Sequence, residues 1–302
     1  MLNKRPIFLH TFSNGGSNLL WNLFQSHPEV VSPIYETGQL FRDPVGRLVT
    51  ALMTQQLDYW SSIRNLSPRR KAPARFFRFV DRRFFNGKMN NLQHTDNREK
   101  KPGVLYTEEE IRDARLVLKC HNAQAFLTDE FARAYPDATF IAMPRDGYAL
   151  GEAYLRRGRV TSARDFAIRY RAVAMKMLSD SRTLPHYHLV RFEDLFSPSF
   201  EVESKAMFEM AGLDYRDLDG LLRFKTKERL PAEEYDRLRS YWNDHGRPDY
   251  VIGSKYWIPA SDVSTFIDFR INEISHERLK PEDKAVIDEV AGDVLTELGY
   301  RS

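Results

Sequence analysis

Short apolar runs alternate with segments of helical periodicity along most of the chain. Four runs have the length and composition of buried strands: residues 6–12, 115–121, 139–143 and 187–191. Helices are expected after them, starting at about Leu19 and then at 123–135, about 148–157, 163–181 and 202–211. Strands that alternate with helices indicate a parallel sheet covered on both faces. The pattern therefore predicts an α/β fold with a central parallel sheet flanked by helices.

In such a sheet the carboxyl ends of the strands meet at one edge, and ligands bind at that edge. The residues that follow the four strands are Ser13–Asn18, Lys119–His121, Arg145–Gly147 and Arg191–Asp194. We therefore expect the functional side chains among these four groups.

The first group is a turn with two glycines that opens a helix. Backbone N–H groups of such a turn can surround an anion, and the helix dipole adds to the attraction. The turn is not a Walker A motif, because no Gly-Lys-Ser/Thr follows and Asn14 stands where a phosphate-facing cation is expected. An ordinary strand-to-helix turn is the competing interpretation, since Asn-Gly is a common turn dipeptide.

Lys119 and His121 share one face of their strand, and Cys120 points to the other face. A His and a Lys at the end of a strand suit a general base beside an anion stabiliser, although both can also be structural. We expect Cys120 to be a small buried hydrophobe. As the single cysteine of the chain it excludes an intramolecular disulfide and a multi-thiolate metal site, and it predicts a reducing, cytoplasmic location.

Two arginines follow apolar strands directly. Arg145 at the sheet edge can bind a phosphate with both ends of its guanidinium, or it can pair with the neighbouring Asp146. For Arg191 the sequence favours a structural ion pair within the run Arg191-Phe192-Glu193-Asp194.

Charge is unevenly distributed within a formal total of +3. Residues 64–88 hold nine Lys or Arg against one acid, Asp81, so this segment carries +8 and the remainder −5. Nucleic-acid binding by the whole protein is therefore not expected. Residues 73–85 mix five Phe with Arg at near-helical spacing, a pattern typical of peripheral contact with an anionic membrane or an acidic glycan. The alternative is a helix that packs its Phe residues on the domain.

Five motifs, in this order, resemble those of the bacterial members of the sulfotransferase family that uses 3′-phosphoadenosine-5′-phosphosulfate (PAPS). They are the loop Thr11–Leu20, the strand end Leu118–His121, the stretch from Tyr135 through Arg145–Gly147 to Arg156–Gly158, the run Val190–Leu195 and the terminal helix Leu279–Tyr300. The third of these resembles the family's 3′-phosphate motif. The resemblance implies a P-loop-like sulfotransferase fold in a single domain over residues 1–302, with a basic aromatic insert at about 58–105.

The resemblance also implies roles for the site residues. His121 and Lys119 would be catalytic: His121 takes the proton of an acceptor hydroxyl, and Lys119 neutralises the bridging oxygen of the donor. The donor-binding residues would be Asn14, Gly15, Gly16, Ser17, Asn18, Leu19, Lys119, Arg145, Ala153 and Phe192. Glu36 would face the acceptor, a glycan, lipid-linked sugar or other small alcohol, and no metal would be needed.

Four positions differ from the family pattern. Asn14 replaces the loop Lys or Arg, Asn18 replaces the second hydroxyl residue, Ala153 replaces a Ser at the 3′-phosphate, and Phe192 replaces a Tyr. A sulfotransferase-fold binding protein without catalysis is therefore an alternative, and a P-loop-like kinase is a further one. Contact of residues 64–88 with the inner face of a membrane is the remaining expectation.

Overall fold

A five-stranded parallel sheet forms the centre of the protein. The computed structural model describes residues 2, 4–33, 36–41, 43–46, 74–93, 98–218, 220–225, 255–263 and 270–301. The strands, in the order in which they lie, are β2 (Val30–Val31), β5 (Arg115–His121), β1 (Ile7–Thr11), β6 (Thr139–Met143) and β7 (Tyr187–Leu189). All neighbouring strands are parallel. The predicted α/β fold with a central parallel sheet is confirmed.

Helices connect and cover these strands. They are α1 (Ser17–Gln25), α4 (Ala74–Met89), α6 (Glu108–Asp113), α7 (Thr128–Ala134), α8 (Gly147–Arg156), α9 (Ala163–Thr183), α10 (Phe192–Leu195), α11 (Phe200–Met210), α14 (Ile271–Arg278) and α15 (Pro281–Glu297). Short 3-10 helices are η1 (Thr37–Phe41), η2 (Asn90–Gln93), η3 (Asn122–Leu127), η4 (Tyr215–Leu218) and η5 (Ala260–Asp262). Two antiparallel hairpins, β3 (Glu99–Lys101) with β4 (Val104–Leu105) and β8 (Leu221–Lys225) with β9 (Lys255–Pro259), lie outside the sheet.

The four predicted strands lie within a few residues of β1, β5, β6 and β7, and the predicted helices lie within a few residues of α1, α8, α9 and α11, with one difference in type. The short strand β2, the helix α6 and the two antiparallel strand pairs were not predicted. The helix expected at 123–135 is divided into η3 and α7. Thr128 begins α7, and its hydroxyl donates to the carbonyl oxygen of Ala125, three residues earlier, at 2.5 Å. Such a side-chain bond competes with regular helix hydrogen bonding, so the two segments remain distinct.

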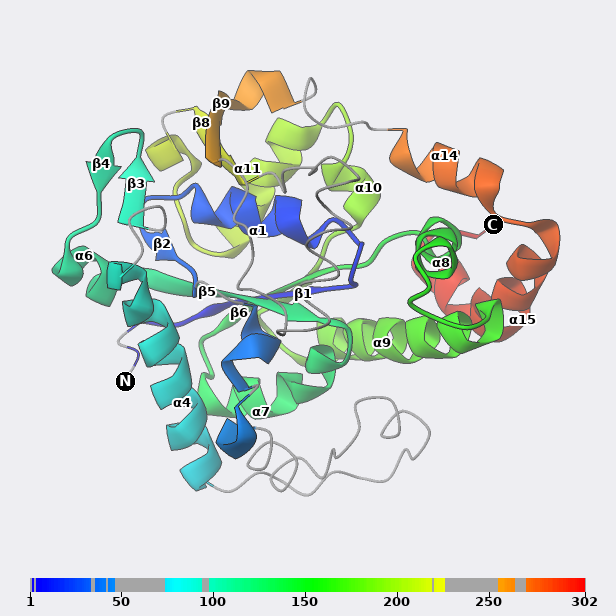
Figure 1. Cartoon of the computed structure of the whole chain (residues 1–302), viewed down its shortest axis with the longest axis horizontal. Coiled ribbons are helices and arrows are strands. Elements are labelled where there is room, and N and C mark those ends of the chain that lie inside the picture. Colours follow the sequence, from blue (N-terminus) through cyan, green and yellow to red (C-terminus); the bar gives the residue numbers. More distant parts are fainter. Residues whose placement is uncertain are drawn as a thin grey trace, which may run out of the picture.

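Alternate residues of the strands point into two separate apolar cores. Leu9 of β1 packs with α1 and α11 on one face, and Phe8 packs with α4, α7 and α9 on the other. Figure 1 shows the same division, with α1, α10 and α11 on one side of the sheet and α4 and α7 on the other. Burial on both faces explains why the strands are nearly continuous apolar runs.

Aromatic side chains of α4 belong to the second core. The ring of Phe8 stacks between those of Phe131 and Phe140, at centroid distances of 4.7 and 4.9 Å, and Phe84 of α4 adjoins this stack. Arg78 and Arg82 of α4 are exposed. The alternative in which the helix packs its Phe residues on the domain is thus confirmed for α4. Residues 64–73 of the basic segment lie outside the described residues, and within the described ranges no helix has the length and apolar character to cross a bilayer.

Lys88 connects the end of α4 to the end of α6. Its side chain is buried, and its Nζ donates to the carbonyl oxygens of Arg112 and Ala114, each at 2.6 Å. Carbonyl groups at a helix end lack partners within the helix, so the buried ammonium satisfies them. Burial, the largest effect, lowers the pKa of Lys88 to about 8.

The lowered pKa predicts a pH-dependent contribution to stability. The folded protein releases the Lys88 proton at about pH 8, whereas the unfolded chain holds it up to about 10.5, the ordinary value. The unfolding free energy of the wild type should therefore rise relative to that of Lys88→Met between pH 8 and 10.5. Urea unfolding of both proteins across this interval measures the difference. A difference that stays constant with pH would contradict the assignment.

Candidate functional site

The turn between β1 and α1 has a left-handed backbone at two positions. Asn14 has φ 62° and Gly16 has φ 78°. The N–H of Gly15 donates to the carbonyl oxygen of Phe12 at 3.0 Å and closes the turn. A Cβ atom on Gly16 would lie 2.3 Å from the Phe192 ring, so both the backbone angle and the close approach require glycine.

Three backbone N–H groups at the start of α1 have no acceptor among the described residues. Among the described residues, none accepts a hydrogen bond from the N–H of Gly16, Ser17 or Asn18, and no side chain caps the helix. The N–H groups of Gly15 and Leu19 are already bonded, to Phe12 and Gly16. Of the backbone N–H groups of residues 15–19, those of Gly16, Ser17 and Asn18 are therefore open to a ligand. An uncapped helix start of this kind attracts an anion.

At the end of β5, two of the predicted site residues contact the same carboxylate, that of Glu36. Lys119 Nζ lies 3.0 Å from Glu36 Oε1, and His121 Nε2 lies 3.2 Å from the same oxygen. Glu36 immediately precedes η1, far from β5 in the sequence. The side chains of Lys119 and His121 are 3% and 15% exposed and that of Glu36 is 33% exposed, so the cluster is reached from the side of the carboxylate.

Lys119 also connects this cluster to the glycine-rich turn. Its Nζ donates to Asn18 Oδ1 at 2.6 Å and lies 4.7 Å from the centre of the Trp21 ring. Both partners belong to α1. The ammonium is therefore held between the carboxylate of Glu36 and the start of the helix whose N–H groups lack acceptors.

The surrounding hydrogen bonds and charges keep Glu36 ionised and determine which ring nitrogen of a neutral His121 carries the proton. Burial would raise the pKa of Glu36, but the hydrogen bonds and positive charges of His121 and Lys119 outweigh it and hold this pKa well below its usual range. Nδ1 of His121 lies 3.1 Å from Thr11 Oγ1. A neutral His121 beside the ionised carboxylate must carry its proton on Nε2, and Nδ1 then accepts from the Thr11 hydroxyl. Both ring nitrogens are thus paired.

Asn122 joins the turn to β5 and α8, a role that none of the five sequence motifs indicated. Its backbone is left-handed, with φ 49°. Its Oδ1 accepts from the N–H of Ser13 at 3.0 Å and from the hydroxyl of Tyr154 at 3.1 Å, while its Nδ2 donates to Ser13 Oγ at 3.1 Å. Asparagine is among the few residues that tolerate this backbone region, which was the available clue.

Arg145 is buried beneath the turn rather than exposed at the sheet edge. Its Nη1 donates to the carbonyl oxygen of Asn14 at 2.5 Å, its Nε donates to Asn272 Oδ1 at 2.9 Å, and its guanidinium lies 4.6 Å from the centre of the Phe192 ring. The alternative of an ion pair with Asp146 is wrong. The Asp146 carboxylate instead accepts from the N–H of Tyr148 at 2.9 Å and contacts His276, whose pKa it raises through that hydrogen bond.

Asn272 comes from α14, a helix outside all five sequence motifs. Its Nδ2 donates to Glu193 at 2.5 Å. Glu193 also accepts from the N–H of Asp146 at 3.0 Å and from the hydroxyl of Tyr300 at 2.7 Å. This network ties α14, α10 and the end of the chain around Arg145. Its members are distant in sequence, so only the folded structure could reveal them.

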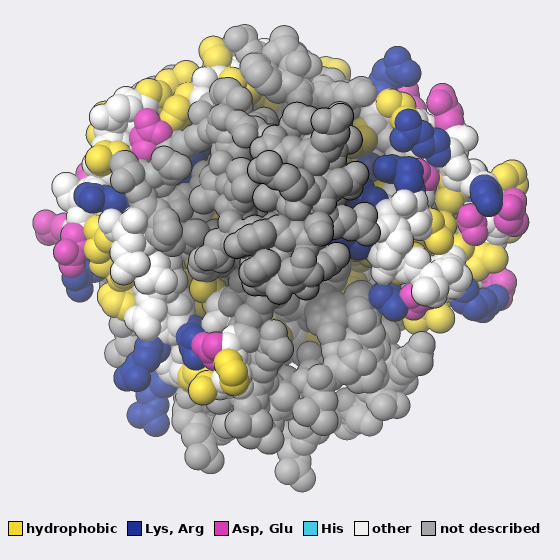
Figure 2. All heavy atoms as spheres, in the orientation of Figure 1, with side chains coloured by type: hydrophobic (Ala, Val, Ile, Leu, Met, Phe, Trp, Pro, Cys, Tyr) yellow, Lys and Arg dark blue, Asp and Glu magenta, His cyan; other side chains and the backbone are white. Residues whose placement is uncertain are grey.

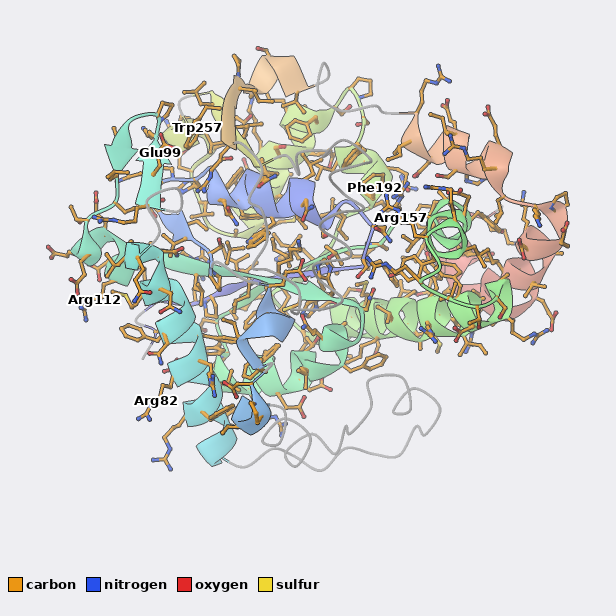
Figure 3. All side chains as sticks on the ribbon, in the orientation of Figure 1. Arg82, Glu99, Arg112, Arg157, Phe192 and Trp257 are labelled. Atoms are coloured by element: carbon orange, nitrogen blue, oxygen red, sulfur yellow. The ribbon has the colours of Figure 1, made fainter. Side chains whose placement is uncertain are left out.

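The remaining predicted donor-binding residues lie around the turn. Phe192 is buried, with its ring 3.9 Å from that of Phe196, and Ala153 is buried on α8. Arg157, at the end of α8, donates through Nη1 to Asn14 Oδ1. Figure 3 shows Arg157 and Phe192 in the region between α8 and α10, and Figure 2 shows Lys and Arg side chains gathered over α8 and α14.

Two structural interpretations are confirmed. Arg191 pairs with Asp194 at 2.7 Å, as favoured for that run. Cys120 is fully buried on the face away from Lys119 and His121, where its Sγ contacts Thr37 Oγ1 at 3.5 Å and burial raises its pKa to about 12. A thiol this protonated is a poor nucleophile.

A pocket of about 660 Å³ lies away from these residues. Glu130, Phe140 and His186 are part of its lining, near the amino ends of β6 and β7. The candidate site lies at the opposite ends of the strands and is marked by charge and open N–H groups. Within the described ranges, no group of three or more His, Cys, Asp or Glu side chains is arranged to hold a metal ion.

Comparison with known proteins finds likeness in structure alone. No protein-family model matches the chain, and no curated protein does either. The sulfotransferase domain of the Synechococcus PCC 7002 olefin synthase aligns with a TM-score of 0.46 at 15% identity, over 96% of this chain and 95% of that chain. The sulfotransferase domain of the curacin biosynthetic pathway aligns with a TM-score of 0.49 at 13% identity, over 100% and 99%. A sulfotransferase from Alicyclobacillus acidocaldarius gives 0.41 at 15%, over 80% and 92%. Such distant likeness does not extend to function, which has to be argued from the residues of the site.

The close approach of Gly16 to Phe192 predicts an unusually costly substitution. Gly16→Ala should lower the unfolding free energy by about 3 kcal/mol, from backbone strain plus the displaced ring. Gly103→Ala is the matched control, because Gly103 has φ 74° but nothing within 4 Å of an added Cβ. It should cost only about 1 kcal/mol. Chemical unfolding of both variants measures the costs, and equal values would show that the ring does not confine the turn.

Proposed function

We propose that the protein is a PAPS-dependent sulfotransferase that moves a sulfuryl group to an acceptor hydroxyl. The observation that carries the proposal is the meeting of Lys119, His121 and Glu36 beside the uncapped start of α1. An anion-binding turn next to a buried cation and a proton-accepting pair is the set of groups that such a transfer needs.

The residues of the turn fit the phosphate of such a donor. The N–H groups of Gly16, Ser17 and Asn18 need acceptors, and phosphate oxygens can supply them. The buried guanidinium of Arg145 and the ammonium of Lys119 add positive charge on two sides of the turn. The donor supplies a sulfuryl group on a phosphate leaving group, and the protein's part is to position and neutralise.

The transfer forms one bond to sulfur and breaks another, so it needs no reactant besides the donor and the acceptor. The acceptor oxygen forms a bond to sulfur and loses its proton, while the bond from sulfur to the bridging oxygen breaks and leaves adenosine 3′,5′-bisphosphate. Lys119, held between α1 and Glu36, would neutralise the charge that develops on that oxygen. Its low exposure strengthens the interaction, because water does not screen it.

We assign the proton of the acceptor hydroxyl to the pair formed by His121 and Glu36. Thr11 already occupies Nδ1, so the acceptor must approach Nε2 in place of Glu36. Nε2 can take a proton only when the ring proton lies on Nδ1, which then donates to Thr11 Oγ1. In the other tautomer the Glu36 carboxylate takes the proton. If His121 takes the proton, the carboxylate stabilises the imidazolium that forms. Glu36 would therefore both lie where the acceptor binds and stabilise the protonated base.

The two alternatives differ in the ligand or the reaction that they require. A kinase holds Mg²⁺ with carboxylates near the phosphates, but the first turn of α1 carries no acidic residue. A non-catalytic binding protein is favoured by the neutral Asn14 and by Ala153. Thermal shifts with adenosine 3′,5′-bisphosphate and with ATP plus Mg²⁺ separate the kinase from the other two, and an acceptor screen separates those.

The acceptor class and membrane contact remain predictions. Glycans, lipid-linked sugars and other small alcohols all offer the required hydroxyl. Contact with an anionic membrane would use the cations of residues 64–88, of which Arg78 and Arg82 are exposed on α4. Because Phe84 lies in the core and Phe77 and Phe79 pack against it, we expect such contact to be electrostatic and to weaken with salt.

Replacing the two β5 residues should abolish transfer without unfolding the protein. We expect His121→Ala and Lys119→Ala each to lower the rate by roughly a hundredfold to a thousandfold, through loss of the base and of the leaving-group cation. Radiolabelled sulfate transfer to a panel of phenols, sugars and lipid-linked sugars measures the rate. Cys120→Ala, between them but on the opposite face, should retain transfer. Wild-type turnover by either β5 variant would disprove its assigned role.

Glu36→Gln should separate donor binding from transfer. The substitution removes a negative charge 3.0 Å from Lys119, so adenosine 3′,5′-bisphosphate should bind more tightly, while the rate of transfer falls because the pair loses its carboxylate. Calorimetry and the transfer assay on the same samples provide both values. Weaker nucleotide binding would mean that Glu36 contacts the donor rather than the acceptor.

A further inference from the structure

Both asparagines of the anion-binding turn accept hydrogen bonds from cations of other elements. Lys119 of β5 donates to Asn18 Oδ1, and Arg157 at the end of α8 donates to Asn14 Oδ1. Positive charge, which this turn lacks in its own sequence, therefore reaches it from both sides. We propose that Arg157 is the phosphate-binding cation of the turn and that Asn14 is its docking point, in place of a cation at position 14.

Arg157 suits this task better than the other arginine that contacts residue 14. Arg145 is 3% exposed, and its Nε and Nη1 are bound to Asn272 and to the carbonyl oxygen of Asn14. That arrangement holds the turn in shape. Arg157 is exposed and held by one side-chain bond, so its guanidinium can exchange the amide oxygen of Asn14 for a phosphate oxygen.

The backbone keeps Asn14 in position for this contact. Asn14 has φ 62°, and its carbonyl is held by Arg145 at 2.5 Å. Its side chain and its carbonyl thus each accept from a different guanidinium, so residue 14 connects α8 to the start of α1. An amide can receive Arg157 here, whereas a lysine would add a third positive charge and repel it.

Favourable interaction of Arg157 with the end of the α8 dipole is the competing explanation. It predicts that Arg157 affects stability but not ligand affinity, and that any nearby cation serves equally. Arg159 provides the matched control, since it is exposed two residues further along. The two explanations therefore differ in a measurable way.

This inference rests on the proposed function. The experiment therefore measures the affinity of the full chain for adenosine 3′,5′-bisphosphate by calorimetry. Arg157→Gln should weaken binding about tenfold to a hundredfold, the value of a charge-assisted hydrogen bond, whereas Arg159→Gln should change it less than about threefold. Thermal unfolding of each variant confirms that it is folded. Equal effects of the two substitutions would overturn the inference and leave the proposed function intact.

A second set of variants moves the positive charge from residue 157 to residue 14. Asn14→Lys in the Arg157→Gln background should restore most of the lost affinity, because the cation returns to the turn. The same substitution in the wild type should gain less than about threefold, since Arg157 already supplies the charge. Equal gains in both backgrounds would overturn the inference. No binding of the bisphosphate by the wild type would instead contradict the proposed function, and the inference with it.

A third arm distinguishes the phosphate that Arg157 contacts. Adenosine 5′-phosphate and adenosine 3′-phosphate are compared as competitors of the bisphosphate in the wild type and in Arg157→Gln. Arg157→Gln should lower the affinity for adenosine 5′-phosphate and leave the affinity for adenosine 3′-phosphate unchanged, because Asn14 belongs to the turn that opens α1. Selective loss of the 3′-phosphate ligand would overturn the inference.

Discussion

The close contact between Gly16 and the Phe192 ring is the constraint on which the site depends. A Cβ at position 16 would clash with the ring, and the left-handed turn leaves three N–H groups open at the start of α1. The Phe192 ring also supports the guanidinium of Arg145, which in turn holds the carbonyl of Asn14. One packing contact therefore sets the conformation of the turn and the place of its buried cation.

Charge in the site is supplied by elements other than the turn itself. Lys119 reaches the turn from β5 and is shared with the carboxylate of Glu36, so the donor side and the acceptor side compete for one ammonium. In the ligand-free protein that competition holds Glu36 ionised. A donor phosphate would draw Lys119 towards the turn and leave Glu36 and His121 to receive the acceptor, which couples donor binding to preparation of the base.

The sequence was sufficient for four of the five strands of the sheet and for the residues that end them, but not for β2, whose two residues are too short for a pattern. Buried parallel strands are apolar runs, and their carboxyl ends coincide, so Lys119, His121 and Arg145 could be found by pattern alone. Contacts between distant segments could not. The pairing of Glu36 with His121, the bond from Asn272 to Arg145 and the role of Asn122 depend on how loops and α14 pack, which no local periodicity encodes.

A crystal structure of the full chain with adenosine 3′,5′-bisphosphate would show whether the turn and Lys119 bind the donor. We expect oxygens of the 5′-phosphate to accept hydrogen bonds from the N–H groups of Gly16, Ser17 and Asn18, with Lys119 Nζ within hydrogen-bond distance of the same phosphate. A nucleotide bound elsewhere on the protein, with the turn and Lys119 unchanged, would contradict this expectation.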